Sequence, residues 1–239
     1  MADRVDLINL SLFEMVFTEK KVMTDNRKPV RVAVNVMRAR LTVIGFNIAI
    51  VSFQIVQLYR LSGGIKVPGV EYGVHLGADI ALFMALALSL IALVAFIMSS
   101  AFDEVGVCTH WVLVAGDLLM YLSLAHTVAG FFAPFSAALV RFAAKLPGHA
   151  METSILRAAL VVAGGLAWLL ATYVGPVVSL ARSPFPRRTN IALGIAYVAA
   201  LFVLAWVSAQ AYMVETRGPG EESGMLLVVL RELVQPLRW

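Results

Sequence analysis

The sequence is poor in charged residues and almost free of cysteine. Charged residues make up 14% of its 239 positions, whereas a typical soluble domain has about 25%. The one cysteine, Cys108, cannot form an internal disulfide and cannot build a cysteine-rich metal site. These two shortages exclude an ordinary soluble domain and a secreted disulfide scaffold.

Several functional motifs are also missing. No glycine-rich phosphate loop precedes a basic helix start, and no Ser–His–Asp arrangement stands out. The last apolar stretch has no lysine for a retinal Schiff base. We therefore name no catalytic residue and expect a protein other than an enzyme. The net charge of +4 points to anionic lipid headgroups of the membrane as partners and not to nucleic acid.

Apolar residues, by contrast, make up 60% of the chain and lie in long runs. About 20 apolar residues suffice to cross a bilayer, and five runs are long enough. These runs are 41–61, 74–100, 108–135, 155–180 and 191–215. Because backbone polar groups cannot stay unpaired in lipid, each run must be a helix, and the lack of strand-type alternation excludes a β-barrel. The sequence predicts an all-α, polytopic bundle of five transmembrane helices.

Two terminal segments flank the transmembrane domain of residues 41–216. Residues 1–40 are basic, and the amphipathic pattern of 3–18 predicts a helix that lies on the membrane. Residues 217–239 form a second interfacial candidate. Its headgroup anchors are Arg231, Arg238 and Trp239. Since the first segment carries more Lys and Arg than any other part outside the spans, we predict a multi-pass protein of the cell membrane with a cytoplasmic N-terminus.

Small residues recur at every fourth position in two of the runs, a spacing that lets membrane helices pack closely. They are Gly73, Gly77 and Ala81 in the second run, and Ala163, Ala167, Ala171 and Gly175 in the fourth. The stripes fit packing within one chain, and they also fit a contact between copies. We expect a homo-oligomer.

Polar and ionisable residues concentrate in the first three runs, where burial in the membrane makes them functional candidates. Folding the runs back at their turns places Asp79 level with positions near 55 and 129 of its neighbours. His126 is then about 4.5 Å from that level along its helix, and His75 lies one helical turn from Asp79. We predict one cluster in the outer half of the membrane. Its members are Gln54, Gln57, His75, Asp79 and His126.

A second polar site is expected nearer the cytoplasm. Asp117 and Tyr121 share one face of the third run, because they are four residues apart. Asn47 of the first run can meet Asp117 from the same half of the membrane. The two sites would be successive stations of one pathway.

These sites favour an ion or proton channel or transporter. Carboxylates supply fixed negative charge, histidine exchanges protons near neutral pH, and amide side chains coordinate or relay. Two alternatives stay open: an accessory or regulatory subunit (or a membrane-perturbing effector) acting with partner membrane subunits, and a redox subunit holding a metal ion or haem. The favoured function needs no cofactor, and a bound metal would take His75, Asp79 and His126 as ligands.

Overall fold

The computed structural model describes residues 30–31, 34–59, 64–66, 73–101, 107–108, 110–216 and 224–239. Within these ranges the chain is almost entirely helical, and five helices are long and apolar enough to cross a membrane. The prediction of an all-α bundle with five spans is confirmed. The helix predicted within 3–18 lies outside the described residues.

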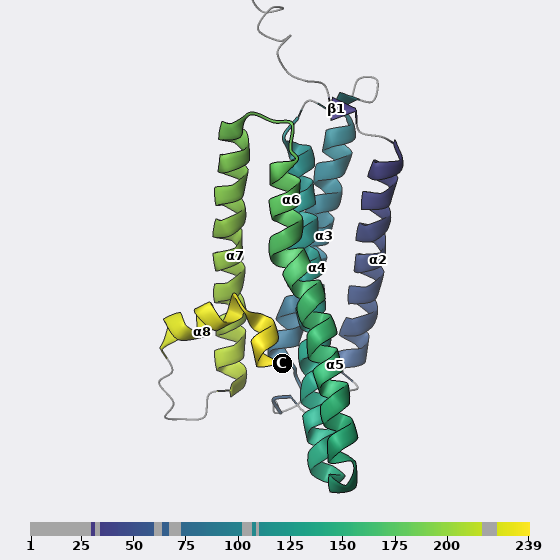
Figure 1. The fold of residues 1–239 in the computed structure, drawn as a ribbon, viewed down its shortest axis with the longest axis vertical. Coiled ribbons are helices and arrows are strands. Elements are labelled where there is room, and N and C mark those ends of the chain that lie inside the picture. Colours follow the sequence, from purple (N-terminus) through teal and green to yellow (C-terminus); the bar gives the residue numbers. More distant parts are fainter. Residues whose placement is uncertain are drawn as a thin grey trace, which may run out of the picture.

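The five spans lie side by side and alternate in direction (Figure 1). The first three are α2 (Val34–Leu58), α3 (Leu76–Ala101) and α4 (Val112–Lys145). The fourth is continuous through α5 (Ala150–Leu169), the π turn η2 (Leu170–Val174) and α6 (Gly175–Ala181). The fifth is α7 (Arg187–Thr216), and the short 3₁₀ helix η1 (Pro147–His149) joins α4 to α5.

The hairpin of α4 and α5 is longer than predicted. α4 continues through Pro134 to Lys145, although its apolar run was expected to end at 135. A proline in a membrane helix frees one backbone carbonyl, and neighbouring helices or local adjustment satisfy that group. α5 begins at Ala150, before the predicted 155. The hairpin therefore extends past the other helices at the lower end of Figure 1.

The central helix of the bundle is α4. Of its apolar window 67% is buried, against 22–33% in the other four spans. Its contact with α3 is close because Gly116 has no side chain: a Cβ there would come within 2.9 Å of the Phe96 ring. Phe96 is itself fully buried and packs with Ile44 of α2 and Met120 of α4. The three first spans thus share one core.

The small residues of the fourth span do not all face the bundle. Ala171 is buried against Trp168, and Gly175 lies against the Tyr121 ring. The exposed members are Ala163 and Ala167. The π turn η2 holds an extra residue in one turn, so the face that α5 turns inward is not continued at the same spacing in α6. Of the predicted stripe in the second run, Gly73 precedes α3 and Gly77 lies in its first turn, both half-buried, and Ala81 is buried.

Different elements cover the two ends of the bundle. Where α2 begins, the strand β1 (Val30–Arg31) pairs antiparallel with β2 (Val107–Cys108). At the opposite end, α8 (Met225–Glu232) and the 3₁₀ helix η3 (Gln235–Arg238) lie across the bundle (Figure 1). The C-terminal segment thus contributes a wall to the end of the bundle where α2 finishes.

α8 packs on α7 through one face. Val228 packs on Ala209 and Met213 of α7, and Glu232 is also buried. Its outer face consists of Leu226, Leu227 and Leu230, which are exposed. An apolar outer face is suited to the acyl boundary of a membrane.

Candidate functional site

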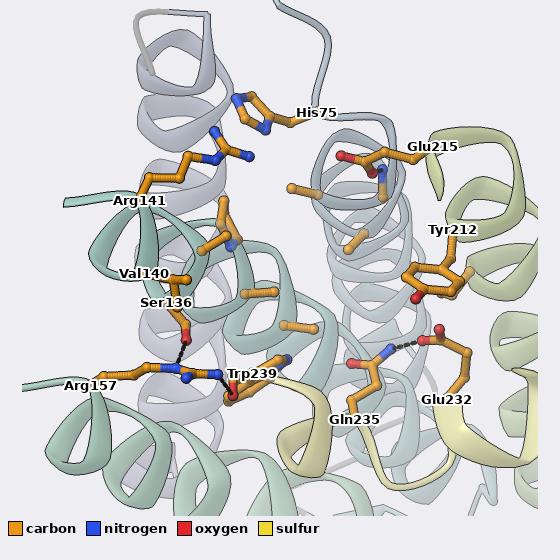
Figure 2. A pocket seen from close by; sticks show the side chains of 18 residues that line it. His75, Ser136, Val140, Arg141, Arg157, Tyr212, Glu215, Glu232, Gln235 and Trp239 are labelled. Carbon is orange, nitrogen blue, oxygen red and sulfur yellow. Dashed lines mark hydrogen bonds between the residues drawn. The ribbon is translucent and has the colours of Figure 1, made fainter. Parts of the chain in front are cut away.

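A cavity of about 500 Å³ lies between α3, α4, α5, α7 and the α8–η3 segment (Figure 2). Its volume is within the range of small-molecule sites, about 300–1,000 Å³. The ionisable side chains that line it include His75, Arg141, Arg157, Glu215 and Glu232. α3 and α5 begin at this end of the bundle, and α4 and α7 finish there, so side chains distant in sequence meet around one space.

The charges of the cavity are segregated. Arg141 and Arg157, from α4 and α5, lie on the side opposite Glu215 and Glu232, from α7 and α8 (Figure 2). The cavity therefore carries two cations on one wall and two carboxylates on the other. Such a space has a strong internal field and little net charge.

Hydrogen bonds fix the charged side chains in place. Arg157 donates from Nε to the Ser136 hydroxyl at 3.2 Å and from Nη2 to the backbone oxygen of Trp239 at 2.9 Å. Glu215 Oε2 accepts from the backbone N–H of Gly77 at 3.0 Å. That N–H belongs to the first turn of α3, where a carboxylate is favourably placed against the helix dipole.

Three buried polar atoms on the cavity lining have no hydrogen-bond partner among the described residues. They are His75 Nε2, Ser208 Oγ and Gln235 Oε1. Leaving a buried donor or acceptor unpaired costs about 1–3 kcal/mol. The atoms come from three separate elements that meet at the cavity. Because all three atoms lack hydrogen-bond partners, the cavity is suited to a polar ligand or to water.

Asp79 lies in the first turn of α3 and is not among the residues that line this cavity. It is buried, one turn along from His75, and its charged neighbours include His75 and Glu215. Its Oδ1 atom has no hydrogen-bond partner among the described residues. The predicted proximity of His75 and Asp79 is therefore present, and Glu215 joins the pair from α7.

His126 belongs to a second, smaller void of about 20 Å³. The ring is almost fully buried, and neither nitrogen has a hydrogen-bond partner in the described part of the chain. Thr172 in the π turn lines the same void, and its hydroxyl is also unpaired there. Glu232 and Gln235 line both spaces, so they stand between the main cavity and His126.

His126 does not join His75 and Asp79 in one cluster, as was predicted from the sequence. Among the described residues, no three His, Cys, Asp or Glu side chains are grouped closely enough to hold a metal ion. His75, Asp79 and His126 thus do not surround one point, because His126 turns toward Trp168 and Thr172. The described residues therefore show no such group at the three positions that a bound metal would have taken.

Gln54 and Gln57 lie on α2, half-buried, and neither lines the two spaces described above. No residue of α2 does. α2 packs on the other side of α3, which keeps its amide side chains away from α7 and α8.

Asn47 closes a polar contact among three helices. Its Nδ2 donates to Ser89 Oγ at 3.0 Å and to Ser123 Oγ at 2.7 Å, and the two hydroxyls are 2.6 Å apart. Ser123 also donates to the Ala85 carbonyl at 2.7 Å. All these groups are buried and joined, so the contact clamps α2, α3 and α4. It does not include Asp117.

Asp117 pairs with a residue that the sequence analysis assigned to the basic N-terminal segment. Arg40 Nε lies 2.6 Å from Oδ1 and Nη2 donates to Oδ2 at 2.7 Å, a two-point contact. Ser179 Oγ is 3.5 Å from Oδ2, and Tyr121 lies within electrostatic reach of both charges. The guanidinium also lies 5.7 Å from the centre of the Phe96 ring. This ion pair closes the α4 interface near the start of α2.

Sequence reasoning missed most of the cavity. Arg141, Glu215 and Glu232 sit near helix ends, where charged residues ordinarily meet water or headgroups and attract no attention. The one usable signal is that all these ends fall on the same side of a five-span bundle. That signal shows that the charged residues lie at the same depth in the membrane. It does not show that their side chains point into one space.

No protein-family model, curated protein or solved structure matches this chain. The geometry of the two spaces and of the ion pair is therefore what bears on function.

Proposed function

We propose that this integral membrane protein moves protons across the bilayer. The observation that carries the proposal is the succession of a charged cavity, a Glu232–Gln235 partition and the buried, unpaired His126. Ionisable groups inside a membrane protein are costly and mark ion or proton routes. Here they follow one another from the end of the bundle toward its interior.

The size of the inner void favours protons over other ions. A space of about 20 Å³ can hold one water molecule, which needs roughly 10–15 Å³ by the same measure. A hydrated cation does not fit there, whereas a proton passes along one water and an imidazole. His126 and Thr172 offer the polar partners that such a water requires.

Each group has a distinct role on this route. Glu215 and His75 exchange protons with the cavity, and Asp79 supports them with its charge. Glu232, held by Gln235 Nε2 at 2.8 Å, passes a proton to the inner void, where His126 receives it. Histidine suits this step because its two nitrogens can take up and release a proton on opposite sides.

The far end of the route is closed. The carboxylate of Asp117 is held by Arg40 at both oxygens, so Arg40 occupies the atoms that a proton on this route would reach. Passage requires that pair to separate, with Tyr121 beside it as the adjacent hydroxyl. A route that is open at one end and closed at the other is typical of a transporter that alternates between two states.

Proton flux into liposomes tests the proposal. The purified full-length chain is reconstituted with a pH-sensitive dye inside, and a potassium gradient with valinomycin supplies the driving voltage. His126→Gln removes the titratable ring and keeps polar atoms, so we expect flux to fall by about a hundredfold or more, the usual scale for removing a positioned proton-transfer group. His149→Gln, an exposed histidine outside both spaces, serves as the control and keeps its flux.

Two results would overturn the proposal. Wild-type liposomes with no flux above empty ones exclude proton conduction by this chain alone. Full flux in His126→Gln removes the inner void from the route. Elution volume and thermal unfolding of each variant confirm that a loss of flux does not come from misfolding.

A further inference from the structure

We propose that the 500 Å³ cavity binds the headgroup of a phospholipid that carries both a phosphate and a primary ammonium, as phosphatidylethanolamine does. The inference does not rest on proton movement, and its test measures retained lipid and not flux. It begins from the segregated charges of the cavity walls.

The opposed charges select a ligand that is itself dipolar. A lone anion that enters meets Glu215 and Glu232, and a lone cation meets Arg141 and Arg157. A zwitterion places its negative end against the arginines and its positive end against the glutamates, so both contacts are favourable. Arginine also matches phosphate oxygens geometrically.

Unused hydrogen-bonding capacity lies on both walls. Arg157 engages Nε and Nη2, and its Nη1 group has no partner among the described residues. On the other wall, Glu215 uses only Oε2, and the Oε1 atom of Gln235 and the hydroxyl of Ser208 are unpaired. The free donor of Arg157 can therefore bind a phosphate, and the free acceptors on the other wall can bind an ammonium.

These acceptors distinguish a primary from a quaternary ammonium. A primary ammonium has three N–H donors, with which it can pair with acceptor oxygens of this wall. A quaternary ammonium has none, and proteins bind it in cages of aromatic rings. A choline headgroup would leave the buried oxygens of Gln235 and Ser208 unpaired, at a cost of free energy.

The position of the cavity selects a lipid over a free solute. His75 and Glu215 sit at helix ends, and Arg141 and Arg157 lie within about two turns of the α4–α5 connection. Helix ends are the level at which headgroups meet spanning helices. Apolar side chains flank it: Val140 lines the cavity and is exposed, and the outer face of α8 carries exposed leucines. A molecule with its polar end in the cavity can therefore lay its chains on apolar surface.

The test uses the full chain in vesicles of phosphatidylethanolamine, phosphatidylcholine and phosphatidylglycerol in equal parts. The protein is extracted again in detergent, and the lipid retained per protein is measured by mass spectrometry. We expect phosphatidylethanolamine to exceed phosphatidylcholine by at least about tenfold, because one unsatisfied polar contact alone corresponds to that factor.

Two variants test the acidic and the basic wall of the cavity one at a time. Glu215→Gln keeps an acceptor for the Gly77 N–H and loses the charge, so it should lower retention of phosphatidylethanolamine about tenfold. It should not lower retention of phosphatidylglycerol, because the variant repels an anion less than the wild type does. Arg157→Gln should lower retention of both. The controls Glu152→Gln and Arg182→Gln remove exposed charges outside the cavity and should change neither.

The proposal is overturned if phosphatidylethanolamine and phosphatidylcholine are retained equally, or if the control variants lower retention as much as the cavity variants. It is also overturned if free phosphoethanolamine binds while the lipid is not retained, because the site then takes a soluble zwitterion. Unchanged elution volume and unfolding temperature of each variant exclude misfolding. If the wild type conducts protons but shows no lipid selectivity, the lipid proposal is wrong and the proton proposal is unaffected.

Discussion

Interior polar residues of this protein fall into two groups according to their partners. Asn47 is hydrogen-bonded and Asp117 is ion-paired to other side chains, in contacts that join α2, α3 and α4. His75 and His126 each present a nitrogen without a partner among the described residues. A satisfied buried group stabilises the fold, whereas an unsatisfied one needs a ligand, water or proton. We therefore assign the first group to architecture and the second to function.

The Arg40–Asp117 pair should behave as a coupled unit. Arg40→Gln leaves a buried carboxylate without its cation, which costs about 3 kcal/mol of stability. The double variant Arg40→Gln with Asp117→Asn removes both charges and should recover most of that loss. Unfolding in mixed micelles measures the cycle, and additive effects of the two substitutions would contradict the assignment.

Asp79→Asn tests the α3 side of the cavity. The substitution removes the charge beside His75 and Glu215 and preserves the side-chain volume, so proton flux should fall by about tenfold while the protein still assembles. Flux in proteoliposomes and elution volume are measured together, with Glu152→Gln as an exposed control. Loss of assembly instead of flux would make Asp79 a structural clamp.

At the scale of elements, counting residues along the chain gave the number of spans and the pairing of His75 with Asp79. It fixed the height of each residue but not the rotation of its helix. His126 shows the consequence, since its ring turns toward Trp168 and Thr172 in the fourth span. Arg40 was hidden for another reason: it precedes the apolar run, yet α2 starts at Val34 and carries it to Asp117.

Gly116 is one of two α4 glycines, with Gly130, that let this helix approach α3 closely, and the chain offers a matched control for it. A Cβ at Gly116 would lie 2.9 Å from Phe96, a fully buried ring, whereas one at Gly45 of α2 would meet nothing within 4 Å. Gly116→Ala should destabilise the protein by about 1–3 kcal/mol through overpacking. Gly45→Ala should stabilise it by about 0.5–1 kcal/mol through helix propensity.

Unfolding of both variants in the same detergent measures the difference. Equal effects of the two substitutions would mean that α3 can move away from α4 at no cost. Opposite signs would show that helix packing, and not propensity, sets the stability at Gly116.

At the scale of the whole molecule, five spans place the start of α2 and the end of α7 on opposite sides of the membrane. The cavity opens on the side where α7 ends. The excess of Lys and Arg in residues 1–40 predicts that α2 begins in the cytoplasm. The charged cavity would then face outward, and the Arg40–Asp117 pair would lie toward the cytoplasm.

Cysteine labelling in intact cells tests this orientation. In a Cys108→Ser background, Glu152→Cys lies in the protruding α4–α5 hairpin and Arg182→Cys in the turn between α6 and α7, and both positions are exposed. A membrane-impermeant maleimide should label the first from outside and the second only after the cells are opened. The reverse pattern would place the cavity in the cytoplasm. Protons would then have to reach His126 from the cytoplasmic side, and the lipid sought by the cavity would belong to the inner leaflet.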